Sequence, residues 1–117
     1  MTGVYDVRVK VDGFDPARGD MTGHGLSGVL TLEEGSGALS EYRHFDAAGE
    51  LSANLPGGAV MPRPSDGLAL LQVGELTHFY IVSMDAPSPG QASSPRFSGR
   101  FWLGHVSGPF VAVRRTP

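Results

Sequence analysis

The stretch that decides the fold is the C-terminal segment from Arg96 to Arg115, which reads RFSGRFWLGHVSGPFVAVRR. Side chains on a strand alternate between the two faces of its sheet. One face of the first run therefore holds Phe97, Gly99, Phe101, Leu103 and His105, and the other holds Arg96, Ser98, Arg100 and Trp102. The Gly/Pro loop from His105 to Pro109 has the length of a hairpin connection. We expect a β-hairpin in which Phe101 and Trp102 face opposite ways, so that one of them lies outside the core.

The length of the chain predicts one domain, and its composition excludes several kinds of site. A chain of 117 residues is large enough to bury a single core, so we expect one domain over residues 1–117. Its formal charge is −3 and Lys10 is the only lysine, so a nucleic-acid partner is not expected. Cysteine is absent, which excludes disulfides, thiolate metal ligands and cysteine nucleophiles.

The first residues carry neither a basic start nor an apolar run, and no segment reaches the length of a membrane span. We therefore expect no signal peptide, no membrane partner and a cytoplasmic protein.

The segment from Val4 to Val11 has the clearest strand pattern. Its apolar face is Tyr5, Val7, Val9 and Val11, opposite Asp6, Arg8 and Lys10. Further strands are expected over Leu26–Glu33, Ala38–Asp46, Glu50–Leu55, Leu68–Val73 and Leu76–Met84. The proline-rich segment Pro56–Pro64 is expected to form an edge or a crossing loop. The long loop Asp12–Gly25 has the length of a lid or binding loop.

About eight strands at short spacing predict an all-β fold, a small antiparallel barrel of about eight strands, with a two-layer β-sandwich as the alternative. Leu76–Met84 is apolar on both faces, and both faces must then be covered. A second copy of the chain is one cover for the outer face, so we expect a homodimer. Coverage by the long loops is the other arrangement.

The order of these elements resembles the calycin-type barrels, the group that includes lipocalins, avidins and allene oxide cyclase-like proteins. The resemblance rests on the opening strand Gly3–Val7, the second strand Leu26–Leu32, and the closing runs Phe97–Trp102 and Val111–Arg115. The chain departs from lipocalins because it lacks an early Gly-x-Trp motif, and from biotin binders because it lacks their aromatic set. The resemblance implies a barrel mouth that holds an apolar small molecule.

One group of side chains is the candidate ligand-binding site. If their strands are neighbours, a ring of polar and aromatic groups lines the interior and binds the few polar atoms of an apolar ligand: Tyr42, His44, His78, Tyr80, Arg100 and Trp102. The alternative is that the aromatic members lie in the core or an interface, while Arg100 and His44 face water.

Other chemistry has little support in the sequence. The four histidines are too far apart for a local metal motif, so no metal is expected, and no cofactor motif is present. Glu41 and Arg43 share a strand face and read as a surface pair, or as an acid–base group with a cationic partner if that face lines a cavity. No serine lies in a nucleophile elbow.

Three functions follow from these observations. The first is the binding of an apolar small molecule in a barrel cavity under the Asp12–Gly25 loop. The second is a barrel enzyme, a cyclase or isomerase, with Glu41, Tyr42, His44 or His78 as acid–base groups. The third is a protein-interaction or regulatory module that docks its partner through an exposed aromatic face including Trp102 or Phe79.

Overall fold

The structure is a computed structural model, and it describes residues 3–34, 36–65, 68–73, 77–85 and 96–115. In this part the chain forms nine strands and one 3-10 helix: β1 (Gly3–Lys10), η1 (Pro16–Arg18), β2 (Gly25–Glu33), β3 (Ser36–Phe45), β4 (Leu51–Asn54), β5 (Gly58–Ser65), β6 (Leu68–Val73), β7 (Thr77–Asp85), β8 (Arg96–Leu103) and β9 (Val106–Arg114). The predicted all-β class is confirmed. None of the described helices is long and apolar enough to cross a membrane.

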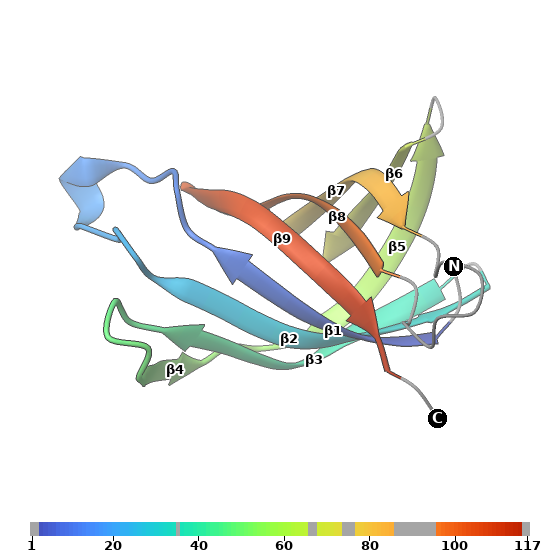
Figure 1. The fold of residues 1–117 in the computed structure, drawn as a ribbon, viewed down its shortest axis with the longest axis horizontal. Coiled ribbons are helices and arrows are strands. Elements are labelled where there is room, and N and C mark those ends of the chain that lie inside the picture. Colours follow the sequence, from blue (N-terminus) through green and yellow to red (C-terminus); the bar gives the residue numbers. More distant parts are fainter. Residues whose placement is uncertain (1–2, 35, 66–67, 74–76, 86–95, 116–117) are drawn as a thin grey trace.

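The strands form one continuous antiparallel sheet that curls on itself (Figure 1). Eight of the described strands pair in a circuit that runs β1, β2, β3, β5, β6, β7, β8, β9 and back to β1, and β4 adds to the edge of β3. Because hydrogen bonds continue around the circuit, the described strands do not divide into two sheets. The small antiparallel barrel is confirmed in place of the sandwich.

The shortest pairing between neighbouring strands of the circuit is that of β3 with β5. There β5 pairs with β3 only over Gly58–Val60, and β4 takes the other end of the same edge at residues 43–45 of β3. The expectation of a loop over the proline-rich segment is wrong, because β5 is a strand. Pro62 and Pro64 lie beyond the contact with β3, so that edge of β5 needs no N–H group from them.

A chain of aromatic rings runs through the interior. Successive centroids lie 4.9–6.3 Å apart, edge to face, in the order Tyr5, Phe97, Phe110, Phe79, Phe101 and Tyr42. The four phenylalanines of this chain are at most 1% exposed. The interior of an eight-stranded barrel is about as wide as its side chains, and these rings lie there.

The C-terminal hairpin of β8 and β9 supplies three of these six rings, Phe97, Phe101 and Phe110. Phe101 is fully buried, whereas Trp102 is 37% exposed, so Trp102 is the residue that lies outside the core. Phe101 lies directly opposite Gly108 in the β8–β9 pair. A Cβ atom at Gly108 would overlap the carbonyl oxygen of Lys10, so β1 and β9 approach each other at this point only because that side chain is missing.

A β-bulge interrupts the alternation of β3. Gly28 of β2 faces two residues of β3, Glu41 and Tyr42, because the register changes between Ser27 and Val29. Glu41 has a φ of 47°, in the left-handed region. The bulge puts both Leu39 and Tyr42 in the core, although an odd and an even position of a regular strand would face opposite sides.

The long loop after β1 is tied to the barrel at its base. The Val11 N–H donates to the His24 carbonyl over 2.9 Å, and the Asp12 N–H donates to the Ser107 carbonyl over 3.0 Å. Further along, the Asp15 N–H donates to His105 Nδ1 over 3.2 Å, while its carboxylate caps η1. These bonds fix the loop beside the β8–β9 turn. Whether it moves as a lid stays a prediction.

Candidate functional site

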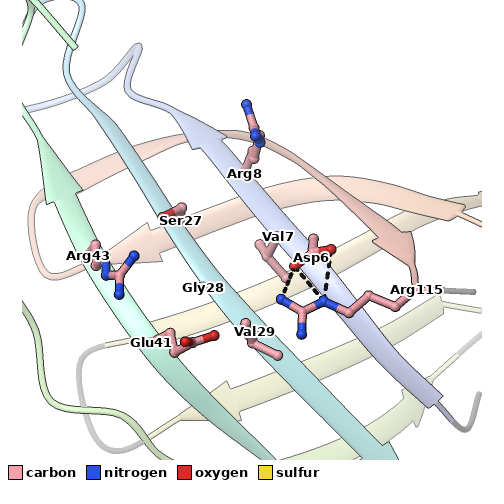
Figure 2. Close-up of a pocket in the computed structure, with 9 residues that line it drawn as sticks. All are labelled: Asp6, Val7, Arg8, Ser27, Gly28, Val29, Glu41, Arg43 and Arg115. Carbon is pink, nitrogen blue, oxygen red and sulfur yellow. Dashed lines mark hydrogen bonds and ion pairs between the residues drawn. The ribbon is translucent and has the colours of Figure 1, made fainter. Parts of the chain in front are cut away.

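A hollow of about 230 Å³ lies on the outer face of the sheet over β1, β2 and β3 (Figure 2). Its lining is mostly polar and consists of Asp6, Val7, Arg8, Ser27, Gly28, Val29, Glu41, Arg43 and Arg115. Tyr5, Val7 and Val9 of β1 point into the core. The residues between them, which are charged, therefore point outward. Alternation within the strand therefore creates the charged face.

The centre of the hollow is one row of side chains across three strands. Arg8 is paired in register with Ser27, and Ser27 with Arg43. Neighbouring strands are about 4.8 Å apart, so the two arginine backbones are roughly 10 Å apart, with the serine hydroxyl between them. This spacing leaves room for a small group that two long side chains approach from opposite sides.

The third arginine of the hollow already has a partner. Arg115 Nε donates to both carboxylate oxygens of Asp6 over 3.0 Å, and Nη2 donates to Oδ1 over 2.8 Å (Figure 2). These hydrogen bonds from Arg115 hold the pKa of Asp6 below its usual value, and the charge of Arg8 adds to the effect. Asp6 therefore stays ionised and keeps Arg115 occupied.

The other two arginines are not bonded to a carboxylate of the described residues, although the charge of Arg8 acts on Asp6. Within the described part of the chain, neither Arg8 nor Arg43 has a hydrogen bond or an ion pair. Glu41 lines the same hollow, as expected of a residue that shares a face with Arg43, but no ion pair joins them. The hollow therefore has an excess of positive charge, because the two guanidinium groups face only one further carboxylate among the described residues, that of Glu41. It also has several free hydrogen-bond donors, on the guanidinium groups and on the Ser27 hydroxyl.

The six residues predicted as a ring do not form one. Phe79 and Phe101 face the core, so their strand neighbours His78, Tyr80, Arg100 and Trp102 lie on the outer face of β7 and β8. There His78 is opposite Trp102, and Tyr80 is opposite Arg100. Of the remaining two, Tyr42 is buried in the core and His44 lies partly buried near the end of β3.

Arg100 is held by the base of the long loop. Both its terminal nitrogens donate to the Asp12 carboxylate, Nη1 over 3.0 Å, and Nη2 also donates to Ser107 Oγ over 3.3 Å. The pKa of Asp12 is lowered and that of Arg100 raised, in each case mainly by this hydrogen bonding. Arg100 thus fixes the loop rather than presenting free donors to a ligand.

Tyr42 ends the aromatic chain with a polar atom in the core. Its hydroxyl is buried and makes no hydrogen bond within the described residues. Burial raises the pKa of Tyr42 to about 12, and nearby Thr77, which is also buried, opposes this in part, although the two hydroxyls do not meet in hydrogen-bond geometry.

His24 and His44 form a pair at the start of β2 and the end of β3. His24 Nδ1 and His44 Nε2 are 2.8 Å apart, with ring centroids 5.0 Å apart. The two nitrogens are much closer together than the two ring centroids, so the rings face each other through these nitrogens. The 2.8 Å between the nitrogens leaves no room for a metal ion that both could bind. Among the described residues, no three histidine, aspartate or glutamate side chains are grouped to hold a metal.

No family model, curated protein or solved structure matches this chain.

The sequence pattern predicts which face of its strand each residue of the hollow occupies, but not that these residues lie side by side. Arg8 and Ser27 fall on outward faces by alternation, and Arg43 shares a face with Glu41. The row Arg8, Ser27 and Arg43 depends on the register of three strands, for which the sequence carries no local signal.

Proposed function

We propose that this protein binds a ligand through an anionic group, a carboxylate or a phosphate, in the outer hollow over β1, β2 and β3. The observation that carries the proposal is the row of Arg8, Ser27 and Arg43, in which two guanidinium groups without ion pairs flank a hydroxyl. A guanidinium group presents planar, paired N–H donors that match the oxygens of a carboxylate or phosphate. None of the four histidines lines the hollow, although Glu41, another of the acid–base candidates, does.

The test is a titration with inorganic phosphate at low ionic strength, followed by NMR shifts of backbone amides. We expect shifts confined to β1, β2 and β3, and an affinity that falls as salt screens the charges. Arg8→Gln and Arg43→Gln should each weaken binding about tenfold or more, because each removes a charge-assisted hydrogen bond.

Arg18→Gln is the matched control, since it makes the same change of charge on η1, whose Arg18 is paired with Asp15. It should leave the affinity for phosphate unchanged. Equal losses in all three variants would mean general attraction to a cationic protein and would contradict the proposal.

The second candidate is the binding of an apolar small molecule inside the barrel. The unpartnered hydroxyl of Tyr42 favours it, because that group can hydrogen-bond to a polar atom of a ligand next to the aromatic chain. Indole, with an apolar ring and one N–H donor, is the probe: it should raise the melting temperature of the protein, and Tyr42→Phe should abolish the rise. No rise at saturating indole would count against it. The barrel enzyme, the homodimer and the cytoplasmic location stay predictions.

A further inference from the structure

A second hollow, of about 410 Å³, adjoins the first on the outer face of the sheet. The two share Arg8 and Ser27 in their linings. The second extends toward the start of β2 and the β3–β4 turn, where Gly25, Phe45 and Gly49 line it. Its exposed wall is mostly apolar, in contrast to the polar wall of the first.

The apolar wall comes from a glycine beside an aromatic ring. Gly25 lies between Lys10 and Phe45 in register, in the row next to that of Arg8, Ser27 and Arg43. Because Gly25 has no side chain, the surface is low over β2 at this row, and the half-buried ring of Phe45 stands beside the depression. Gly49 closes the far side from the turn, with open space where a Cβ atom would lie.

The distance between the two rows limits the size of a ligand. Same-face rows are two residues apart along a strand, about 7 Å. A single anionic group bound at Ser27 thus places the next few carbon atoms of its own molecule over Gly25 and against Phe45.

We propose that the ligand is an amphipathic anion, with one carboxylate or phosphate joined to a compact apolar body, such as a short alkyl chain or a single ring. The anionic group binds between Arg8 and Arg43, and the apolar body lies in the hollow beside Phe45. This inference rests on the proposed function and adds the chemical class of the ligand.

The test compares acetate, butyrate, hexanoate and octanoate by the same NMR titration. Each methylene that enters the apolar hollow should tighten binding about threefold to fourfold until the chain outgrows it. Phe45→Ala should remove this gain with chain length and leave the affinity for acetate unchanged, whereas Arg8→Gln should weaken binding of every member. Phe45→Leu, which keeps an apolar side chain at this position, should give an intermediate slope even if Phe45→Ala is poorly folded.

Met61→Ala is the control for Phe45, because Met61 is an exposed apolar residue of β5, and none of the described residues of β5 lines either hollow. It should keep the full dependence on chain length. Equal affinity for acetate and octanoate, with binding still lost in Arg8→Gln, overturns this inference and leaves the anion site standing. Absence of binding for every carboxylate and for phosphate overturns both proposals. A gain with chain length that Phe45→Ala and Phe45→Leu leave intact places the apolar group elsewhere and also overturns this inference.

Discussion

Phe110 lies directly opposite Gly99 in the β8–β9 pair. Its ring, 1% exposed, contacts those of Phe79 and Phe97 in the aromatic chain. On the other side of β8, a Cβ atom at Gly99 would overlap the carbonyl oxygen of Tyr80 in β7. The missing side chain therefore lets β7 and β8 approach, while the large ring opposite is buried in the core.

Replacing Gly99 with alanine should strongly destabilise the barrel. The new methyl group meets backbone, which cannot move aside as a flexible side chain does, so we expect a loss of about 3 kcal/mol or more in the free energy of unfolding. Urea denaturation measures it. Gly49→Ala is the comparison, because Gly49 has a φ of 81° but nothing near its Cβ position, and its cost should be closer to about 1 kcal/mol. Similar losses in both variants would mean that β7 moves easily at Gly99.

Glycine should be preferred at the bulge of β3. Glu41 has a φ of 47°, a conformation that costs a residue with a Cβ atom about 1–2 kcal/mol. Glu41→Gly should therefore be more stable than Glu41→Ala by about 1 kcal/mol, the reverse of the usual order within a strand. The two variants lose the same carboxylate, so the comparison isolates the backbone. A more stable alanine variant would mean that the bulge relaxes.

Removing the hydroxyl of Tyr42 should not weaken the fold. The group is buried without a hydrogen bond among the described residues, and a buried unsatisfied polar group costs about 1–3 kcal/mol. Tyr42→Phe should thus raise the free energy of unfolding by about 1 kcal/mol. Tyr5→Phe, at the other end of the aromatic chain, should have little effect because the Tyr5 hydroxyl is not a buried unpaired group. Loss of stability in Tyr42→Phe would mean that the hydroxyl has a hydrogen-bond partner, Thr77 or a bound molecule, and would contradict the prediction.

The pair of His24 and His44 should make stability depend on pH. Burial lowers the pKa of His44, the charge of His24 lowers it further, and Asp46 opposes both. The unfolded chain then binds a proton more readily than the folded one, so stability falls as the pH drops from about 6.5 toward the lowered pKa, and is constant above that range. Unfolding curves at a series of pH values measure this.

His44→Gln should remove the contribution of His44 to this dependence and leave that of other groups. In the variant His24→Gln, the pKa of His44 should rise toward its usual value, because the repulsion from His24 is gone while burial remains. NMR titration of the His44 ring follows it directly. An unchanged pKa of His44 in His24→Gln would show that burial alone lowers it.

The sequence by itself determined most of the strands, with β5 the exception, and, for the regular ones, which side of each faces the core. In β1, alternation placed Tyr5 and Val7 inside and Asp6 and Arg8 outside, as found. In the C-terminal hairpin it required Phe101 and Trp102 to face opposite ways. These assignments need only the two-residue period of a strand and the free energy gained by burying apolar side chains, which are local properties.

Tertiary structure alone decided where the alternation of side chains along a strand is interrupted and which strands pair. The bulge at Glu41 changed the face of β3 between Leu39 and Tyr42, and no residue in the sequence marked it. The row of Arg8, Ser27 and Arg43 required strand register across β1, β2 and β3, and the contact of His24 with His44 required the loop to return beside β3. Register is set by the packing of the whole barrel, since a shift of one residue turns every side chain of a strand to the other face. The fold class could thus be predicted from local patterns, whereas the site depends on distances between residues far apart in the chain.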